Sequence, residues 1–575
     1  MLLDSKQQRG RCLNRLRRAS KQLRFLWYAT FPSVMTTLIL VILLNPESAS
    51  AIELRDSDQA TLHPTEPTEI TLIGQDLRSE SGKAADLWCN SPVTVEVVDT
   101  ENADRNRVRY RLTPTMPMGG VVTIRAYNEK SVSQAMLFFV SSPAGQNAPP
   151  ESADPLEMPF GFDLKSPGNN DKTIQFQCEQ GQQFCAEIIG SRIGSAVDAV
   201  LILSDQDGNE LAFADDHPIT GSDPVLRWKA TYTGIHKLTM KDVEYRGGLR
   251  MHVRVNGVSA VGRTHPPAIR RGETRRLLTM GESSTAPLAD VIMHVPLSDS
   301  PGLGFVPQSS ILAPFIKSDL PVYTEAECQQ VPVPALFCGT IGAASQVDSV
   351  TFNAAKSEKL IIKFESVDGP FIGDLRLFRG TEKVRDHHFG RDPRGTLQYT
   401  VPETDTYRIE IRDVLERFGP GHEYCLSIRN DLAPSILRVA PVNQGDRRIR
   451  NDKPHRQVWF NDETLPLLIR ADRRGFNGPI TVRAELDGLA CPVDGRIEEK
   501  KNEAEVQIHL PEPVPEMAFK KLRIFGQCKV DGRIKYVPVD LSEHVKRDFE
   551  DYLTLPSDIT NTIAVVVTPY NEEKK

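Results

Sequence analysis

The chain has 575 residues, of which 39% are hydrophobic and 25% are charged. These proportions are ordinary for a globular protein and exclude a disordered chain, a collagen and a polytopic membrane protein. A chain of this length predicts about four to five domains. The 41 prolines and 38 glycines, with few long amphipathic runs, favour many short strands joined by turns. The sequence therefore predicts an all-β fold.

A basic segment followed by an apolar one opens the chain. Eight Lys and Arg residues stand against Asp4 in the first 24 positions, and Phe25 to Leu44 then run without a charge. Ala49-Ser50-Ala51 fits the small-residue site that signal peptidase reads. About 20 apolar residues also suffice to span a bilayer, so residues 1–51 are predicted to be a signal peptide or a retained anchor. Both alternatives predict an exported protein that is periplasmic, at the cell surface or secreted.

The predicted mature chain is acidic. Removing residues 1–51 takes away 8 of 69 basic and 2 of 76 acidic residues, which leaves 61 against 74 and a balance of −13. This balance disfavours nucleic acid as a partner. The basic clusters within 270–276 and 447–450 are interpreted as solvated strand and loop faces.

Eight cysteines remain after the predicted signal segment, at positions 89, 178, 185, 328, 338, 425, 491 and 528. An even number in an exported chain favours disulfides, and the sequence has no C-x-x-C pair of a zinc ribbon or thioredoxin-like site. Cys491 and Cys528 each begin a Cys-x-Val-Asp-Gly sequence and are the best predicted pair. Cys178 and Cys185 flank a turn at Gly181 but differ in apolar phase, so a disulfide between them would need a bulge or a slipped register.

The chain contains an internal repeat. Residues 233–243 (TGIHKLTMKDV) match residues 404–414 (TDTYRIEIRDV) at an offset of 171, and Phe176 pairs with Phe352 at an offset of 176. The offset changes as expected if strands are kept while loops differ in length. Each copy has about 100 residues with a period-2 apolar pattern, which predicts a β-sandwich.

Residues 150–257 and 335–431 resemble the bacterial pre-peptidase C-terminal domain, a jelly-roll-like sandwich found behind secreted peptidases and in large surface proteins. In residues 150–257, called copy one, the resemblance rests on 198–211 (DAVLILSDQDGNEL), Ala214-Asp-Asp216 and the strand that begins at Thr233.

Residues 335–431, called copy two, match the family less well. Gly339, Asp348, the hairpin at Phe352 and residues 404–414 follow the pattern. Arg379-Gly-Thr-Glu-Lys, however, stands where the family has its Asp-x-Asp-Gly-Asn turn. Copy two is therefore interpreted as a divergent member.

Three further segments resemble immunoglobulin-type (Ig-like) sandwiches: 52–142, a small module at 258–320, and the C-terminal region 432–575. In the last segment the resemblance rests on 470–482 (RADRRGFNGPITV) and Asp487-Gly-Leu489. Residues 141–155 and 313–334 are rich in Pro, Ser and Ala and are predicted linkers. The predicted architecture is a series of tandem β-sandwiches that alternates Ig-like and pre-peptidase-type modules.

Oxygen-bearing side chains are dense on the loops of copy one, where they are expected to gather at one end of the sandwich: Asp205, Asp207, Asn209, Asp215, Asp216 and Asp223. Such oxygens suit calcium, which takes six to eight of them. The alternative is an ordinary turn in which Asp207-Gly208 supplies positive φ and the Asp side chains cap backbone amides. His387 and Arg394 replace Asp216 and Asp223 in copy two, so a calcium site is expected in copy one alone.

Other candidate sites are weaker. His387 and His388 are adjacent, and on a strand they would point to opposite faces, so an exposed polar loop is the preferred interpretation. The sequence contains no H-E-x-x-H, G-x-S-x-G, P-loop or subtilisin-like triad motif. A pair of carboxylates that folding brings together would leave no spacing to read. Trp228 alternates with Leu226 and aligns with Tyr399, which predicts a core position rather than a lectin-like site.

The sequence thus predicts a non-catalytic, exported modular protein for binding, adhesion or spacing at the cell surface or in the envelope. The expected partner is an extracellular or envelope protein or polysaccharide. The family resemblance supports a second hypothesis, an accessory partner of an extracellular peptidase. A third hypothesis, a calcium-dependent adhesin, rests on the acids of copy one.

Overall fold

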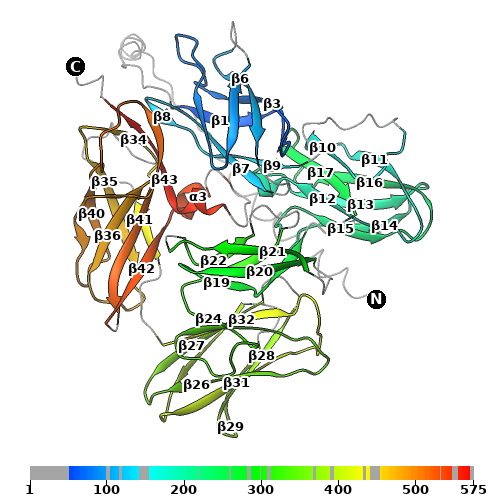
Figure 1. The fold of residues 1–575 in the computed structure, drawn as a ribbon. Helices are drawn as coiled ribbons and strands as arrows, with labels where there is room; N and C mark the ends of the chain where they lie inside the picture. Colours follow the sequence, from blue (N-terminus) through cyan, green and yellow to red (C-terminus); the bar gives the residue numbers. More distant parts are fainter. Residues whose placement is uncertain are drawn as a thin grey trace, which may run out of the picture. The chain divides into compact units, whose positions relative to one another are not determined.

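The structure of the chain is a computed structural model (Figure 1). It describes residues 51–98, 104–115, 120–141, 154–217, 219–257, 261–281, 287–297, 299–306, 312–366, 371–388, 394–430, 436–440, 453–530, 532–546, 549 and 555–569. The predicted signal segment and most of the predicted linker 141–155 lie outside these residues. Strands dominate the described chain, which confirms the all-β prediction. None of the helices in the described ranges is both long and apolar enough to cross a membrane.

Residues 52–141 form a sandwich of two sheets. Its strands are β1 (Glu53–Ser57), β2 (Thr61–Leu62), β3 (Thr68–Gln75), β4 (Asp86–Cys89), β5 (Val93–Val97), β6 (Arg107–Pro114), β7 (Val121–Asn128), β8 (Ser131–Val132) and β9 (Met136–Val140). One sheet has the order β1-β3-β6-β5 and the other β2-β9-β7-β4, with β8 paired to β7. Alternate residues of β3 and β6 are buried, among them Leu72 and Tyr110, because one face of each strand covers the core.

Copy one is a sandwich of two four-stranded sheets. Its strands are β10 (Phe160–Lys165), β11 (Lys172–Cys178), β12 (Gln183–Ile189), β13 (Ala199–Asp205), β14 (Glu210–Ala214), β15 (Val225–Lys229), β16 (Gly234–Asp242) and β17 (Arg250–Asn256). The sheet orders are β10-β17-β12-β15 and β11-β16-β13-β14.

Copy two repeats this topology. Its strands are β25 (Ala335–Thr340), β26 (Asp348–Ala354), β27 (Lys359–Ser366), β28 (Gly373–Arg379), β29 (Glu382–His388), β30 (Arg394–Thr400), β31 (Asp405–Asp413) and β32 (Glu423–Arg429), and the preceding strand β24 (Val322–Thr324) joins the same sheet. The orders β25-β32-β27-β30 and β26-β31-β28-β29 match those of copy one strand for strand, and β24 is added at the β25 edge. The sequence repeat is therefore a repeat of topology.

A smaller sandwich of two three-stranded sheets precedes copy two. Its strands are β18 (Gly262–His265), β19 (Ala268–Arg270), β20 (Thr274–Gly281), β21 (Pro287–His294), β22 (Gly302–Phe305) and β23 (Pro314–Ser318). The prediction of a linker at 313–334 is wrong, because this stretch contains β23 and β24, and Phe315 is buried in the core. Pro314 begins β23, a position where proline costs the ladder little, so a proline-rich composition did not indicate an open linker here.

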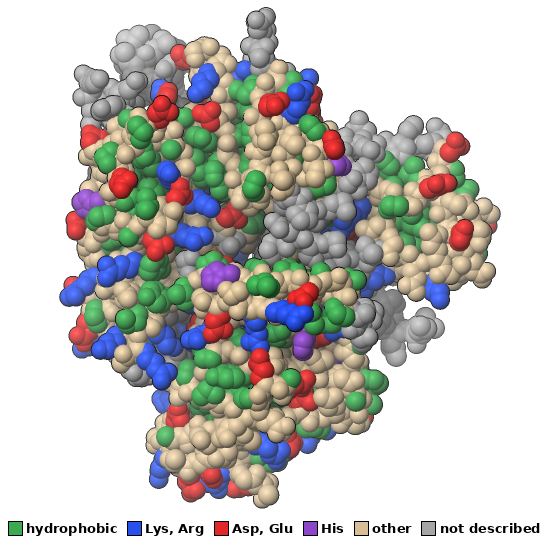
Figure 2. Space-filling view, in the orientation of Figure 1, with side chains coloured by type: hydrophobic (Ala, Val, Ile, Leu, Met, Phe, Trp, Pro, Cys, Tyr) green, Lys and Arg blue, Asp and Glu red, His purple; other side chains and the backbone are tan. Residues whose placement is uncertain are grey.

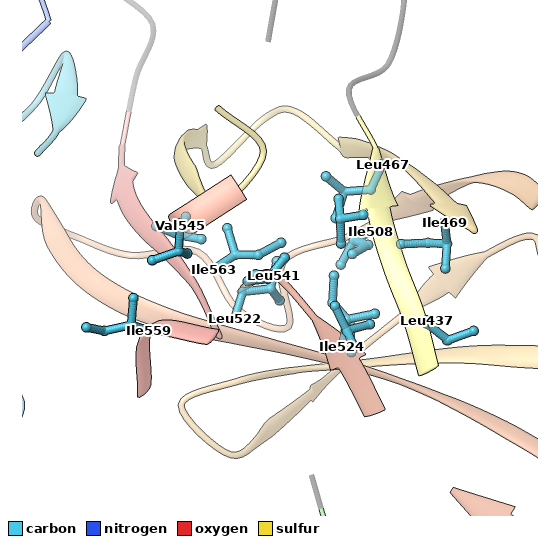
Figure 3. Close-up of a cluster of buried hydrophobic side chains, with 14 of the residues drawn as sticks. Leu437, Leu467, Ile469, Ile508, Leu522, Ile524, Leu541, Val545, Ile559 and Ile563 are labelled. Atoms are coloured by element: carbon cyan, nitrogen blue, oxygen red, sulfur yellow. The ribbon is translucent and has the colours of Figure 1, made fainter. Parts of the chain in front are cut away.

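The C-terminal region is one connected sheet of eleven strands. They are β33 (Ile436–Ala440), β34 (Arg456–Phe460), β35 (Leu465–Asp472), β36 (Ile480–Leu486), β37 (Leu489–Cys491), β38 (Val493–Asp494), β39 (Arg496–Ile497), β40 (Glu503–Ile508), β41 (Ala518–Val530), β42 (Arg533–Asp540) and β43 (Thr562–Thr568). Two short helices, α2 (Ser542–Val545) and α3 (Ser557–Thr560), add Val545 and Ile559 to the core that the strands enclose (Figure 3).

The structure holds all eight cysteines after residue 51 as thiols. The predicted pair Cys491 and Cys528 is wrong, because Cys491 in β37 lies on one side of β36 and Cys528 belongs to β41 on the other. The shared Cys-x-Val-Asp-Gly sequence instead ends in two turn glycines, Gly495 and Gly532, with φ of 103° and 80°.

Cys178 and Cys185 are in strands of different sheets, β11 and β12. Cys178 lies in the core of copy one, whereas Cys185 packs on the opposite face with Ile219 and Val261. This placement agrees with the difference in their apolar phase, so the two cysteines do not form a hairpin pair.

Hydrophobic cores are shared between sandwiches. The largest cluster joins the C-terminal region to Leu137 and Phe139 of the first sandwich and to Ile189 and Ile193 of copy one. A second shared cluster joins Cys185 of copy one to Val261, which precedes β18. Residues 51–575 accordingly form one compact unit.

We expect Ile193→Ala to destabilise the C-terminal region as well as copy one, because Ile193 is buried in the core that includes the C-terminal region. Truncating a buried Ile costs about 2–5 kcal/mol. Hydrogen exchange should accelerate both in copy one and in β41. Leu201→Ala is the matched control, since Leu201 is buried in the core of copy one alone; its effect should stay within copy one. Exchange in β41 that is unchanged by Ile193→Ala would contradict the shared core.

Candidate functional site

The structure separates the six predicted calcium ligands. Asp205, Asp207 and Asn209 lie at the turn between β13 and β14, whereas Asp215 and Asp216 follow β14 at the other end of the same hairpin. The seven residues of β13 place these ends about 20 Å apart. The predicted set therefore does not gather at one end of the sandwich.

The group at the turn has the hydrogen bonds of ordinary turn chemistry. Asp205 Oδ1 accepts the backbone N–H groups of Asp207 and Asn209 at 2.9 and 2.8 Å, and Gly208 has a φ of 89°. Hydrogen bonds from the Asn209 side chain and backbone lower the pKa of Asp205. The Asp205 carboxylate thus stabilises the turn, which matches the alternative drawn from the sequence.

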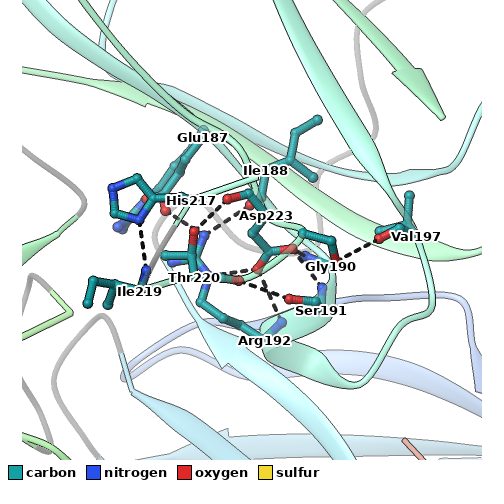
Figure 4. Close-up of polar contacts among 12 residues, drawn as sticks. Glu187, Ile188, Gly190, Ser191, Arg192, Val197, His217, Ile219, Thr220 and Asp223 are labelled. Atoms are coloured by element: carbon teal, nitrogen blue, oxygen red, sulfur yellow. Dashed lines mark hydrogen bonds and ion pairs between the residues drawn. The ribbon is translucent and has the colours of Figure 1, made fainter. Parts of the chain in front are cut away.

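Asp223 is fully buried, and its carboxylate is already coordinated by hydrogen-bond donors (Figure 4). It accepts the backbone N–H groups of Gly190, Ser191 and Arg192 at 2.8, 2.7 and 3.1 Å. The Arg192 Nε–H donates to the same carboxylate at 2.7 Å. Asp223 is therefore the cap and counter-ion of the 3₁₀ turn Ser191–Ile193.

Glu187 extends this buried network. Its carboxylate receives Arg192 Nη2 at 2.6 Å and also the Nε–H of Arg254. Burial raises the pKa of Glu187, but the two guanidinium groups outweigh it and lower the pKa to about 2. The sequence places Glu187 in phase with Cys185, facing away from the core of copy one. The structure covers this second face as well, so the acid is paired rather than solvated.

Three acids do lie together at the other end of the hairpin. Asp198 directly precedes β13, and Asp215 and Asp216 directly follow β14, so the antiparallel pairing brings them to one place. One carboxylate oxygen from each lies within 4.8 Å of the others. Burial, followed by the charges of Asp216 and Asp215, raises the pKa of Asp198 to about 6. This trio is the only group of three potential metal ligands in the part of the chain that the structure describes.

The trio has the donor chemistry that calcium requires. Three carboxylates offer up to six hard oxygens, and the raised pKa of Asp198 reflects burial followed by the nearby charges of Asp216 and Asp215. Sequence reasoning included Asp215 and Asp216 but missed Asp198. The signal was present, because a residue directly before one strand of a hairpin must face the residue directly after the other.

Among the described residues of copy two, no such group of ligands is found. His387 lies exposed in β29, opposite Leu375 of β28. The side chains of His388 and Arg394 are outside the described residues.

A buried Thr61, Asp163 and His252 resemble the residue types of a catalytic triad but not its order. Asp163 accepts from His252 Nδ1 at 2.8 Å and from Thr61 Oγ1 at 2.9 Å, so the carboxylate sits between the hydroxyl and the imidazole. In a triad the imidazole occupies that middle place to take the proton of the hydroxyl. Asp163 also accepts the backbone N–H groups of Ala60 and Thr61. The arrangement therefore joins copy one to the first sandwich.

Glu325 and Asp348 form a close carboxyl pair. Desolvation and the neighbouring Asp348, which shares a hydrogen bond with it, raise the pKa of Glu325 to about 7. Asp348 also accepts the Tyr424 hydroxyl at 2.9 Å. The two carboxyl groups of glycosidases stand roughly 5–9.5 Å apart to flank a sugar bond. A directly hydrogen-bonded pair has no such gap.

The three tryptophans in the described residues all pack against other side chains. Trp459 is buried in the C-terminal core, and Trp228 packs half-buried against the core of copy one. Trp88 stacks on Phe519 with ring centroids 4.6 Å apart.

Comparisons with known proteins find distant structural likeness alone. No family model matches the chain, and no curated protein matches it. The pre-peptidase C-terminal domain of Bacillus anthracis collagenase is 14% identical, with 20% of this chain and 100% of that chain covered and a TM-score of 0.15. Fibronectin(III)-like modules of Clostridium thermocellum CbhA are 10% identical, with 38% and 90% covered and a TM-score of 0.14. The BSP domain of a biofilm-associated protein is 10% identical, with 88% and 97% covered and a TM-score of 0.13.

We expect the acidic trio to make stability fall as pH rises. A carboxyl whose folded pKa is raised contributes stability below its unfolded pKa of about 4, and this contribution is lost as pH rises through about 6. Asp198→Asn should therefore raise Tm at pH 8 and leave Tm unchanged at pH 3.5. Asp205→Asn is the control with the opposite sign, because the pKa of Asp205 is lowered. If the Tm of Asp198→Asn at pH 8 were equal to or below that of wild type, the expected destabilisation by charged Asp198 would be contradicted.

We expect calcium to raise Tm at pH 8 by neutralising the trio. At 100 times its dissociation constant, one calcium ion adds about 2.7 kcal/mol. Asp215→Asn combined with Asp216→Asn should abolish the rise, and Asp205→Asn should retain it because Asp205 belongs to the turn. Equal Tm values in excess calcium and in chelator would leave the trio without a metal.

Proposed function

We propose that this chain is a non-catalytic, exported scaffold that binds or spaces other molecules at the cell surface or in the envelope. One observation carries the proposal: the described residues between 51 and 569 belong to sandwiches that share hydrophobic cores. A chain built in this way would act mainly by binding other molecules at the surface of its sandwiches.

Polar contacts between sandwiches support a fixed scaffold. Arg250 in β17 donates from Nη1 to the carbonyl oxygens of Gln59 and Leu137 in the first sandwich, both at 3.3 Å. Arg263 in β18 pairs with Glu423 in β32 of copy two. Arg250, Arg263 and Glu423 are buried, so their pairing restrains the contacts between sandwiches as well as filling them.

The engagement of reactive groups supports a non-catalytic role. Asp163, His252 and Glu187 are buried in contacts that hold the fold, and each has protein partners. Basic and acidic side chains are mixed over the visible face of the molecule (Figure 2). Mixed charge of this kind favours solubility and contact with neutral or mixed partners over nucleic acid.

The acidic trio favours calcium-dependent adhesion as a second candidate. An ion bound by Asp198, Asp215 and Asp216 would tie the start of β13 to the end of β14. The role of accessory partner of a peptidase rests on the resemblance of copies one and two to the pre-peptidase C-terminal domain.

The test begins with the protein recovered from the cells that produce it. We expect it in extracytoplasmic fractions, with envelope material, and without peptide or glycan hydrolysis above a heat-inactivated sample. Hydrolysis above that control would contradict the non-catalytic role, and a cytoplasmic location would contradict export. Stoichiometric recovery with a secreted peptidase would support the accessory role instead, and recovery with the envelope that requires calcium would support the adhesin.

A further inference from the structure

Cys338 and Cys425 face each other across two paired strands. The antiparallel register of β25 and β32 places Cys338 directly opposite Cys425, and their sulfur atoms are 3.0 Å apart. A disulfide needs about 2.05 Å between sulfurs, so side-chain rotation that brings the sulfurs about 1 Å closer is enough, without movement of the strands. The two residues are 87 positions apart in sequence, so nothing in their spacing pairs them.

The same cross-strand position in copy one carries a different bond. Strands β10 and β17 correspond to β25 and β32, and the core pair Phe162 and Val253 corresponds to Phe337 and Leu426. The next pair along is Asp163 and His252 in copy one and Cys338 and Cys425 in copy two. The repeat therefore places a side-chain bond at this site in copy one and two thiols in copy two.

This position is where each copy meets the sandwich before it. In copy one, Asp163 binds the backbone of Ala60 and Thr61. In copy two, both cysteines are buried in an apolar cluster with Ala268 and Leu320 of the small preceding sandwich. The two facing thiols thus stand, among apolar side chains, where copy one has its Asp–His pair, and they are the side chains at this position that can join β25 to β32.

We propose that Cys338 and Cys425 form a disulfide bond in the exported protein, an inference that rests on the export proposed above. The oxidant is a disulfide-bearing donor of the extracytoplasmic space or oxidised glutathione. The thiolate of one cysteine attacks a sulfur of that disulfide and releases a thiolate. The thiolate of the second cysteine then attacks the mixed disulfide and releases the other sulfur. Two protons and two electrons pass from the cysteines to the oxidant, which becomes two thiols.

The bond forms before the joint closes. Both thiols are buried and out of reach of an oxidant in the folded state, and burial raises the pKa of Cys425 well above its usual value. Oxidation therefore belongs to the folding chain, and the finished bond is shielded from reductants by the same cluster.

The test maps disulfides in the full chain. Protein recovered from extracytoplasmic fractions is alkylated while denatured, digested without reductant and analysed by mass spectrometry. A second sample is reduced, unfolded and refolded with oxidised glutathione before the same treatment. We expect one linked peptide pair that holds Cys338 and Cys425 in both samples, with Cys491 and Cys528 alkylated and unlinked.

The two samples separate the two claims. A bond that forms on refolding but is absent from the recovered protein would overturn export, while the pairing geometry would stand. Absence from both samples, or a different linked pair, would overturn the disulfide itself.

As a second readout, prior reduction should lower Tm by about 5 °C or more in wild type and in a variant with Cys491→Ala and Cys528→Ala. It should not do so in a variant with Cys338→Ala and Cys425→Ala, and a shift there would count against the proposal.

Discussion

A carboxylate without access to water determines how copy one joins its neighbours. Asp223 is buried, so its charge must be met by protein donors, and the backbone N–H groups of Gly190, Ser191 and Arg192, at one turn, supply three of them. That turn aims Ile193 away from copy one and into the core that includes the C-terminal region. Arg192 then links Asp223 to Glu187 and so to β17 through Arg254. Local charge pairing thereby fixes a long-range hydrophobic contact.

The described residues repeat a pair of sandwiches: the first sandwich precedes copy one, and the smaller sandwich of two three-stranded sheets precedes copy two. The joint in each pair involves the same two strands, β10 with β17 and β25 with β32, but its chemistry differs. One joint uses Asp163, His252 and the Arg250 guanidinium, and the other uses two cysteines and the pairing of Glu423 with Arg263. The joint is therefore a structural position that different bonds satisfy. This supports a protein whose role depends on holding its modules in place.

The sequence predicted the strands and the repeat because both depend on local pattern. Period-2 burial and the match of 233–243 with 404–414 are properties of neighbouring residues, and they were enough to identify two sandwiches of equal topology. The site was predicted only in part. Asp205 and Asp215 are near in sequence but lie at opposite ends of a hairpin, and Asp198 joins the trio through strand pairing. The cysteine pair and the buried Asp223 depend on contacts between distant segments, which no spacing rule encodes.

Cores shared between sandwiches hold the described chain together, and calorimetry of the full chain is the sharpest test of this sharing. We expect one dominant cooperative transition, with a van't Hoff enthalpy close to the calorimetric enthalpy, because sandwiches that share buried residues cannot melt separately. Independent modules would instead give several resolved transitions, each with the enthalpy of a domain of about 100 residues, roughly 60–80 kcal/mol. That result would reduce the chain to separate sandwiches on tethers and would contradict the scaffold.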